Sequence, residues 1–433
     1  MRAPAAPPGS PPASFDRLWA ELAAIGRDPA GGYRRHAYTP PELELREWFT
    51  ATADGYGLEV EEDRAGNLWA WWGAPPPPGV AADRRAVVAG SHLDSVPRGG
   101  AFDGPLGVVS GLLAVAELRR RGLTPQRPVA VVAFADEEGS RFGVACAGSR
   151  LLTGQLAPDR ARSLTDDDGL SMAEALRASG RDPARLGPEP DRVAGIGAYV
   201  ELHIEQGRGL VDLDAPIGLG SLIRPHGRWR FDLLGRADHA GTTRLSDRDD
   251  PMLAQARLVL TARSSAEACG GGGAVATVGR VVVEPNAVNA IPARVAAWLD
   301  ARADEEADVR AMVARVSAEV GVTPVEESWT PAVQLDAGLA EDLARLLTPR
   351  WGALPRLASG AGHDAGILAS VGVPTAMLHV RNPTGISHAP EEHAETADCL
   401  TGVAALTAVL ADLAGLGAGG GGGADVGEGG CSR

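Results

Sequence analysis

Four runs of mostly apolar residues alternate along the chain with segments that read as helices. The runs have the length of strands and lie at residues 84–94, 127–139, 197–207 and 373–380. Residues 107–122 predict a helix, which ends in three arginines and a glycine. Strands that are apolar along most of their length are typical of a parallel sheet covered by helices on both faces. The pattern therefore predicts an α/β fold with a mostly parallel sheet.

The segment between the third and fourth runs has a different pattern. Residues 227–235 alternate between apolar and polar positions, which is typical of a half-exposed strand. A helix, two strands, a second helix with an acidic first turn and a last strand follow. This β-α-β-β-α-β order is the split βαβ pattern of a small α+β domain. We therefore expect an inserted domain at 222–330, a larger domain formed by 14–221 and 331–413, and disordered tails at 1–13 and 414–433.

Composition and charge narrow the class of protein. The chain has 433 residues, of which 44% are hydrophobic, and this suits a folded protein of two domains. A net charge of −15 without a basic cluster makes nucleic acid an unexpected partner. We expect no membrane span, because no apolar run approaches the roughly 18 residues that a membrane helix needs. The four cysteines are scattered and the N-terminus lacks a signal-peptide pattern, so we expect a cytoplasmic protein with reduced thiols.

Residues of the kinds that bind metals gather where the apolar runs end. They are His92, Asp94, Asp103, Asp136, Glu137, Glu138, His203, Glu205, Gln206 and His388. A single histidine or acidic turn of this kind is usually structural, and the glycine-rich loop after His92 lacks the spacing of a phosphate loop. Together, however, these residues fall on one edge of one sheet, and they suit divalent cations such as Zn²⁺ or Mn²⁺. The glycines would let the loop fold back and bring Asp103 beside His92.

Seven short segments, in order between residues 15 and 412, resemble one family. They are GSHLDSVPRGGAFDGPLGV, FADEEGSRFG, ELHIEQG, HAGTT, EPNAVNAIP, SGAGHDA and GISHAPEE. Together they are similar to the dinuclear metallo-amidohydrolases of the M20 peptidase clan. Within the clan they resemble the branch with allantoate amidohydrolases, N-carbamoyl-L-amino-acid hydrolases and β-ureidopropionases. The resemblance implies a di-metal aminopeptidase-like catalytic domain, and a lid and dimerisation domain inserted into it.

The resemblance also implies a set of metal ligands. His92 and His203 would bind one ion, Glu138 and His388 would bind the other, and Asp103 would bridge the two. Asp94 would hydrogen-bond His92 from outside the ligand set, and Glu137 would be the general acid/base. Zn²⁺ or Mn²⁺ is expected, with Co²⁺ as a further candidate. Two such ions lower the pKa of a water and polarise a carbonyl group, as the hydrolysis of a urea-type bond requires.

The same resemblance assigns residues to a substrate, expected to be a small carboxylate with a ureido or carbamoyl group. They are His239 as a catalytic residue, and Gln206, His226, Asn289, Arg302, Ser359 and Gly360 as substrate contacts. His239 would hydrogen-bond the oxyanion, and Arg302 would clamp the carboxylate bidentately. In the family, the His239 and Asn289 positions can reach the active site of the partner subunit. We therefore expect a homodimer formed through the lid.

Two features depart from the family pattern. This chain has HAGTTR, with Arg244, where branch members commonly have HAGTTP. His226 stands where many members have glutamine, and Arg224, Arg228 and Arg230 surround it in the sequence. One explanation is a more basic exposed strand. The alternative hypothesis is that one or two of these residues contact a second carboxyl or a larger polar group on the substrate.

The leading functional hypothesis is ammonia release from a ureido or carbamoyl substrate. We place allantoate first and an N-carbamoyl-L-amino acid second, and keep another N-acyl amino acid, such as an N-formyl dicarboxylic one, as a further candidate. An M20 aminopeptidase or dipeptidase is a second class, and a non-catalytic binding protein on the same fold is a third. The HIEQG histidine favours the ureido branch over the peptidases. The complete set of five ligands with Glu137 argues against the binding protein.

Overall fold

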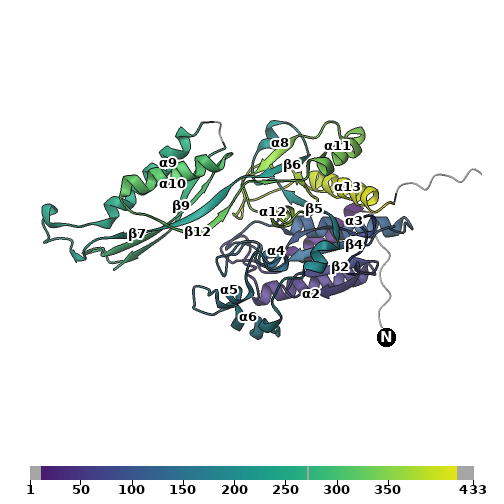
Figure 1. Ribbon diagram of the computed structural model, residues 1–433, viewed down its shortest axis with the longest axis horizontal. Coiled ribbons are helices and arrows are strands. Elements are labelled where there is room, and N and C mark those ends of the chain that lie inside the picture. Colours follow the sequence, from purple (N-terminus) through teal and green to yellow (C-terminus); the bar gives the residue numbers. More distant parts are fainter. Residues whose placement is uncertain (1–10, 271–272, 417–433) are drawn as a thin grey trace, which may run out of the picture.

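Two separate sheets organise the protein in the computed structural model, which describes residues 11–270 and 273–416 (Figure 1). The larger sheet has nine strands, and helices cover both of its faces. The smaller sheet has four strands and carries two helices. We refer to the part built on the larger sheet as the catalytic domain and to the part built on the smaller sheet as the lid. The observed architecture confirms the fold class predicted from the sequence.

The centre of the large sheet consists of the four strands that the apolar runs predicted. They are β3 (Ala86–His92), β4 (Val129–Phe134), β5 (Ile196–Ile204) and β15 (Thr375–Val380). They lie in the order β4-β3-β5-β15, and each neighbouring pair is parallel. Every residue of β3, β4 and β15 is buried, because helices lie on both faces. This burial explains why these strands are apolar throughout.

Strands at the two edges of the large sheet were not predicted. They are β1 (Glu59–Glu62), β2 (Leu68–Trp72), β6 (Ile217–Ile223), β13 (Val333–Gln334) and β14 (Arg356–Ser359). β2 pairs with β4, and β6 pairs with β15, and both pairs are antiparallel. The sheet is therefore mixed, with a parallel core between antiparallel edges.

Two groups of helices cover the large sheet. One face carries α1 (Pro11–Ala23), α2 (Pro40–Gly55), α3 (Pro105–Arg120), α11 (Ala337–Trp351) and α13 (Thr396–Leu413). The other carries α4 (Ala147–Thr153), α5 (Pro158–Ser163), α6 (Met172–Ala178) and α12 (Asp364–Ser370). Helix α1 begins at Pro11, inside the segment that we predicted to be disordered. Residues 1–10 and 417–433 of the predicted tails lie outside the described residues.

Helix α13 corrects one expectation from the sequence. We expected no segment long and apolar enough to span a membrane, but α13 meets that test by length and composition, with a mean hydropathy of 1.4 over 18 residues. Half of these residues are buried within the protein, and α13 packs against α3 and β15. Val403, Leu406 and Leu410 belong to the main hydrophobic core. The apolar surface of α13 therefore has a partner inside the fold.

The lid has the strand and helix order that the sequence predicted. Its antiparallel strands, in the order β12-β7-β11-β9, are β7 (His226–Leu234), β9 (Val275–Glu284), β11 (Arg294–Arg302) and β12 (Val325–Thr330). Its helices are α9 (Pro251–Ala268) and α10 (Glu306–Val320). Along β7, buried and half-buried residues alternate, and Trp229, Phe231 and Leu233 pack into the lid core. The lid therefore has a hydrophobic core of its own.

Candidate dinuclear metal centre

The predicted metal ligands meet at the carboxyl edge of three neighbouring parallel strands. His92 ends β3, His203 is the penultimate residue of β5, and Glu137 and Glu138 follow β4. Because β4, β3 and β5 run in the same direction, their carboxyl ends share one edge of the sheet. Asp136 has a left-handed conformation, with φ of 53°. The chain therefore turns sharply just before the two adjacent glutamates.

The loop after β3 returns Asp103 to the strand end from which it departed. It passes closest to other groups at two glycines. A Cβ atom at Gly104, which has φ of 84°, would lie 2.4 Å from the ring of His92. A Cβ atom at Gly100 would lie 2.3 Å from the Glu392 carboxylate. Glycine at these positions therefore allows a close approach that no larger residue permits.

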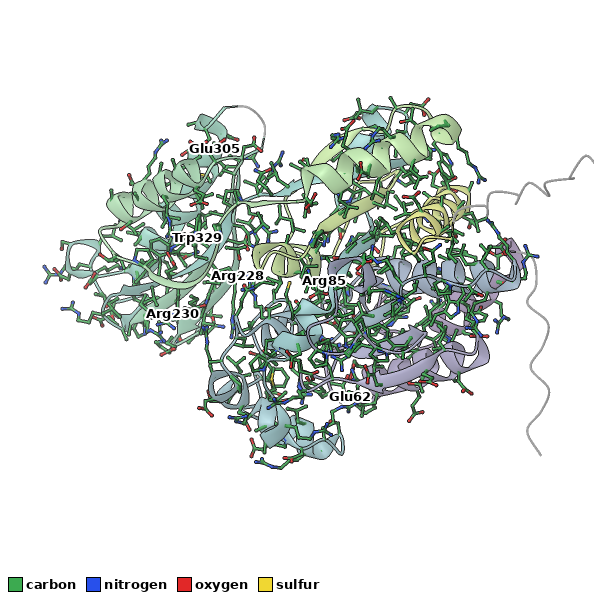
Figure 2. All side chains as sticks on the ribbon, turned by 45° about the vertical axis from the view of Figure 1, so that its right-hand side comes forward. Glu62, Arg85, Arg228, Arg230, Glu305 and Trp329 are labelled. Atoms are coloured by element: carbon green, nitrogen blue, oxygen red, sulfur yellow. The ribbon has the colours of Figure 1, made fainter. Side chains whose placement is uncertain are left out.

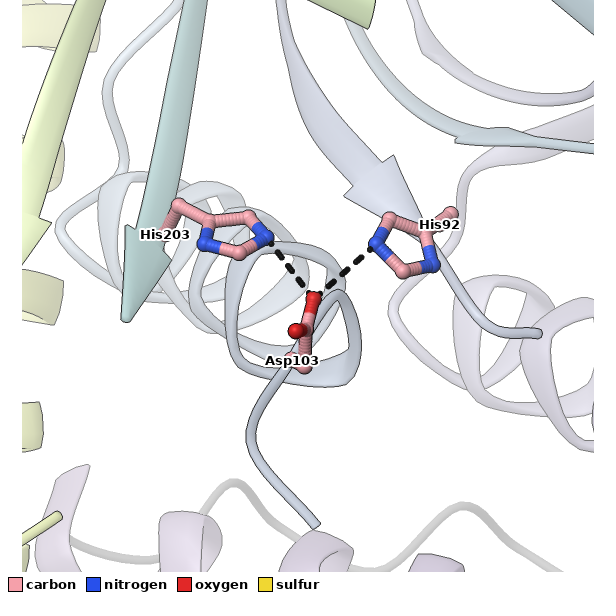
Figure 3. A group of neighbouring side chains, drawn as sticks. All are labelled: His92, Asp103 and His203. Carbon is pink, nitrogen blue, oxygen red and sulfur yellow. Dashed lines mark ion pairs between the residues drawn. The ribbon is translucent and has the colours of Figure 1, made fainter. Parts of the chain in front are cut away.

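Asp103 lies between two groups of ligand atoms. Figure 3 shows the first group, formed by His92 and His203. Its Oδ1 atom is 3.5 Å from His92 Nε2 and 3.2 Å from His203 Nε2. Its Oδ2 atom is 3.4 Å from His388 Nε2, which is itself 3.4 Å from Glu138 Oε2. The two oxygens of one carboxylate thus face two different sets of side chains, as the bridging role predicted for Asp103 requires.

The chemistry and spacing of these groups fit divalent metal ions. Two donor atoms that each lie about 2.1 Å from a tetrahedral ion are separated by roughly 3.4 Å, which matches the observed spacing. The Nε2 atom of His92 is buried and has no hydrogen-bond partner among the described residues. Such an orphaned donor atom is costly unless a ligand satisfies it. The buried histidine and carboxylate clusters are therefore consistent with a dinuclear site of the M20 type.

The charges of the site also favour bound cations. Burial opposes the ionisation of Asp103, but the nearby rings of His203, His388 and His92 hold its pKa well below the usual value. Burial and the neighbouring Asp103 raise the pKa of Glu138 to about 7. The pKa of His388 rises to about 9 despite partial desolvation, because Asp103 and Glu138 stabilise its charged form. In the metal-free site, protons on groups such as His388 and Glu138 offset the negative charge of the clustered carboxylates. Bound metal ions would neutralise the same charge.

The orientation of the histidines comes from their backbone surroundings. His92 Nδ1 lies 3.1 Å from the backbone oxygen of Asp94, and His203 Nδ1 lies 2.8 Å from the backbone oxygen of Ile204. We predicted that the Asp94 side chain would hydrogen-bond His92. Instead the Asp94 carboxylate accepts the backbone N–H groups of Glu137 and Glu138, both at 3.1 Å. Its distance of 3.6 Å from His92 Nδ1 is longer than a hydrogen bond.

Gln206 contacts a predicted metal ligand, which the sequence did not indicate. Its Nε2 atom donates to Asp103 Oδ2 across 2.8 Å and lies 3.3 Å from Ser387 Oγ. Its Oε1 atom has no partner among the described residues, and Gln206 also lines the catalytic cavity. The amide nitrogen of Gln206 is occupied by Asp103, so the predicted contact with the substrate would be made by its Oε1 atom.

Two residues near the site were missed in the sequence. Glu392 accepts the backbone N–H groups of Phe102 and Asp103. Cys146 places its Sγ atom 3.2 Å from Glu137 Oε1. The only sequence signal for Glu392 is its place four residues after His388, in the segment SHAPEE, and Cys146 has no such signal.

A cavity of about 420 Å³ opens above the metal centre, between the catalytic domain and the lid. Asp103, Glu137, Glu138, His203, Gln206 and His388 line it from the catalytic domain. The lid contributes His226, Arg228 and Arg302, and Arg228 lies where the lid meets the catalytic domain (Figure 2). Three of the predicted substrate contacts, Gln206, His226 and Arg302, therefore line the same cavity as the metal ligands, whereas Ser359 and Gly360 do not line it.

Arg302 and Gly360, two of the predicted substrate contacts, adjoin each other. Arg302 donates to Gly360 O across 2.6 Å. It also forms a bidentate pair with Asp300, at 2.8 and 3.1 Å, so its guanidinium already has a carboxylate partner. Ser359 Oγ lies 2.8 Å from His363 Nε2. Burial lowers the pKa of His226, with Arg302 adding to this effect, so the ring stays neutral at neutral pH.

His239 and Asn289 lie away from this cavity. His239 belongs to the short strand β8 (Asp238–His239), which pairs with β10 (Ala290–Ile291). Asn289 accepts the backbone N–H of Ala240 across 3.0 Å, so the two predicted residues are neighbours. Both are exposed and neither lines the cavity. Within this chain, the described residues therefore form a site that lacks both side chains.

The fold and the site are consistent with a dinuclear metal site of the M20 type, and comparisons with known proteins give the family. Residues 88–412 match peptidase family M20/M25/M40. An N-carbamoyl-L-amino acid amidohydrolase of Geobacillus stearothermophilus is 38% identical over 413 residues, which cover 90% of this chain and 96% of that protein. An allantoate amidohydrolase of Escherichia coli strain K12 is 34% identical over 406 residues, which cover 91% of this chain and 96% of that protein.

A solved structure agrees with these sequence relatives. The crystal structure of an amidase of the hydantoinase/carbamoylase family from Burkholderia vietnamiensis superposes with a TM-score of 0.80 and 32% identity. The match covers 92% of this chain and 97% of that one. The chain belongs to the M20 family, in its hydantoinase/carbamoylase branch. It is an amidohydrolase that acts on carbon–nitrogen bonds other than peptide bonds, as the sequence predicted.

Proposed function

We propose that the protein is a dinuclear metal-dependent hydrolase that cleaves the carbamoyl group of an N-carbamoyl-L-amino acid. One water is consumed, and the products are the free amino acid, ammonia and carbon dioxide. The observation that carries the proposal is the position of Asp103, with one oxygen facing His92 and His203 and the other facing His388. The 38% identity with an N-carbamoyl-L-amino acid amidohydrolase supports this substrate class.

Allantoate is the second candidate substrate, although it was our first from the sequence. The relative that bears this name is 34% identical over 91% of the chain, so the same motifs support both compounds. Both compounds have a ureido group and a carboxylate. The metal centre acts on the ureido group in either case, and the residues around the rest of the cavity decide between them.

Glu137 has the position of a group that moves protons in this reaction. Its Oε1 atom is held by Cys146, and its Oε2 atom lies 3.7 Å from His92 Nε2, beside the metal centre. Burial, together with the charges of Asp364 and Glu138, raises the pKa of Glu137 well above that of an ordinary carboxyl group. Bound divalent ions would lower the pKa of the attacking water and polarise the carbonyl group. Glu137 would accept the proton of that water and deliver it to the leaving nitrogen.

The lid would complete the site from a second copy of the chain. In His239, Nδ1 accepts the backbone N–H groups of Gly241 and Thr242, which leaves the proton on Nε2. Nε2 is then a donor suited to an oxyanion, as the predicted role requires. Because His239 is exposed and outside its own cavity, we propose that it acts in the partner subunit of a homodimer.

Exposed apolar residues on the outer surface of the lid support the proposed dimer. β9 is an edge strand of the lid sheet, and Val281 and Val282 on it are exposed. On the adjacent helix α9, Leu253 and Leu260 are 62% and 70% exposed. Exposed apolar side chains beside an unpaired strand edge mark an interaction surface. Two copies of the chain related by a two-fold axis would cover both the edge of β9 and the exposed leucines of α9.

A substrate panel tests the proposed function. Ammonia would be measured with N-carbamoyl-L-amino acids and allantoate, and formate with N-formyl amino acids, after loading the protein with Zn²⁺, Mn²⁺ or Co²⁺ in parallel. We expect the largest kcat/KM with an N-carbamoyl-L-amino acid. Faster ammonia release from allantoate would select the second candidate. No ammonia from either class with any of the three metals would refute the proposal.

A further inference from the structure

A second, smaller cavity adjoins the catalytic cavity on the side of α4. It has a volume of about 150 Å³. The two cavities share wall residues that include Arg150, Gln155, His226 and Trp329. A space of 150 Å³ equals the volume of roughly five water molecules in the liquid. It would hold a side chain of about five non-hydrogen atoms, such as a carboxyethyl group, on a substrate whose reacting group faces Asp103.

Most charged side chains around the catalytic cavity are neutralised by a partner. Arg302 and Arg228 both pair with Asp300. Glu326 and Glu327, which also line the cavity, pair with arginines of the lid. A side chain that is already paired has less free energy to gain from a charged ligand, because the ligand must displace an existing partner.

Arg150 differs from these residues, as does the exposed Arg160, which lines only the larger cavity. Arg150 lies on α4, is half-buried and lines both cavities. Its Nε atom donates to the backbone oxygen of Ala145 across 3.1 Å, and one terminal nitrogen lies 3.4 Å from Thr330 Oγ1. Within residues 11–270 and 273–416, it forms no ion pair with a carboxylate. A half-buried guanidinium without a counter-ion in a cavity wall is a binding group for an anion.

We propose that this side cavity binds a second carboxylate of the substrate through Arg150. The substrate is then an N-carbamoyl amino acid with an acidic side chain. This inference rests on the proposed function and narrows its substrate class. It makes Arg150 a specificity-determining residue.

This proposal assigns the second carboxylate of the substrate to a different arginine from the ones that the sequence suggested. The sequence hypothesis placed it on Arg244 or on the arginines around His226. Each of those arginines already has a carboxylate partner within 4 Å. The pairs are Arg224 with Asp304, Arg228 with Asp300, Arg230 with Asp232, and Arg244 with Asp247.

Two substrates of the same shape and different charge test the proposal. They are N-carbamoyl-L-glutamate and N-carbamoyl-L-glutamine, with ammonia release as the measurement. We expect kcat/KM of the wild-type protein to be at least tenfold higher for the glutamate compound, the order expected of a charge-assisted hydrogen bond. Arg150→Gln should reduce this preference to less than threefold while activity on the glutamine compound stays within threefold of wild type. Arg230→Gln, a control outside both cavities, should keep the full preference.

Several results would overturn the proposal. Equal kcat/KM of the wild type for the two compounds would do so, as would an equal loss on both in a folded Arg150→Gln variant. If Arg244→Gln, and not Arg150→Gln, reduces the preference for the glutamate compound, the result would support the sequence hypothesis instead. If Arg150→Gln does not fold, inhibition of the wild type by L-glutamate and L-glutamine replaces it. We then expect at least tenfold stronger inhibition by L-glutamate, and equal inhibition would refute the subsite.

Failure of the proposed function would be distinguishable from failure of the subsite. If no N-carbamoyl compound is hydrolysed, the proposed function is wrong. The subsite is then tested by calorimetric binding of the same two compounds to the metal-loaded protein. At least tenfold tighter binding of the glutamate compound supports it, and equal binding refutes it.

Discussion

Glu392 Oε1 accepts the backbone N–H of Asp103 across 3.0 Å. The same oxygen accepts the N–H of Phe102 across 2.7 Å, so one buried carboxylate fixes the loop that presents the bridging aspartate. Ser387 Oγ lies 3.0 Å from Asp103 Oδ2 and 3.2 Å from Glu392 Oε2. Glu392 therefore connects the segment of His388 to the loop of Asp103 and determines the spacing between them.

Replacing Glu392 should weaken metal binding without removing any ligand. We expect Glu392→Ala to lower the affinity for Zn²⁺ or Mn²⁺ by roughly 10- to 100-fold, the usual effect of losing a group that orients ligands. Glu392→Gln should lose less, because its amide oxygen still accepts both N–H groups. Calorimetric titration of the metal-free protein measures this. Glu391→Ala is the matched control, since Glu391 is exposed, and an equal effect in both alanine variants would contradict the role of Glu392.

Glu137→Gln should separate metal binding from proton transfer. The variant retains the shape of the side chain and should still bind metal, while kcat falls by about 10²- to 10⁴-fold because the general base is lost. Ammonia release and metal content are measured on the same preparation. The control is Glu327→Gln, which changes an exposed lid carboxylate that pairs with Arg230. It should keep at least half of the activity if the loss in Glu137→Gln is specific to that carboxylate. A Glu137→Gln variant within tenfold of wild type would exclude it as the base.

Metal binding should become tighter as pH rises. The metal-free His388 has a pKa raised to about 9 from 6.5, chiefly because Asp103 and Glu138 overcome the effect of burial. A raised pKa stabilises the folded metal-free protein fully below about pH 6.5, and this stabilisation is lost as pH rises through 9. Metal binding requires neutral His388, so it releases the proton in this range. Calorimetry in buffers of different ionisation enthalpy should show proton release between pH 6.5 and 9, and a pH-independent affinity would contradict this.

The proposed action of His239 in the partner subunit is open to a complementation experiment. Glu137→Gln and His239→Ala should each be nearly inactive alone. Mixing equal amounts and allowing subunits to exchange should restore roughly a quarter of wild-type activity, because half of the dimers are mixed and each has one intact site. Ultracentrifugation of the same samples checks that they are dimers. If the mixture stays inactive although mixed dimers form, His239 acts within its own chain.

The sequence was most informative where residues are buried on both sides or lie close together in the chain. The central strands β3, β4, β5 and β15 were predicted because their burial makes them apolar throughout. The edge strand β1 has half-buried and exposed residues and therefore no clear pattern. Strand β2 is a short apolar run that is buried throughout, and it was missed although it has the same pattern as the central strands. The grouping of His92, Asp103 and His203 was predicted by strand order and by family resemblance, and the structure places them together.

Contacts between distant segments could not be predicted from the sequence. Glu392 is 289 residues from Asp103 in the chain, and nothing near either residue indicates their hydrogen bond. Gln206 was assigned to the substrate because it follows His203, yet its amide nitrogen binds Asp103. The lack of a carboxylate beside Arg150 is likewise visible only once α4 and β12 are placed next to each other. Such contacts depend on tertiary packing, which local patterns do not encode.

Counting bound metal ions tests the central claim most directly. The protein would be loaded with Mn²⁺ or Zn²⁺, freed of unbound metal, and analysed by elemental mass spectrometry alongside Asp103→Ala. Because Asp103 is shared by both groups of ligands, we predict two ions per wild-type chain and at most one, weakly bound, in the variant. A well-folded wild-type protein that holds fewer than two ions, or a variant that retains both with unchanged affinity, would contradict the dinuclear centre.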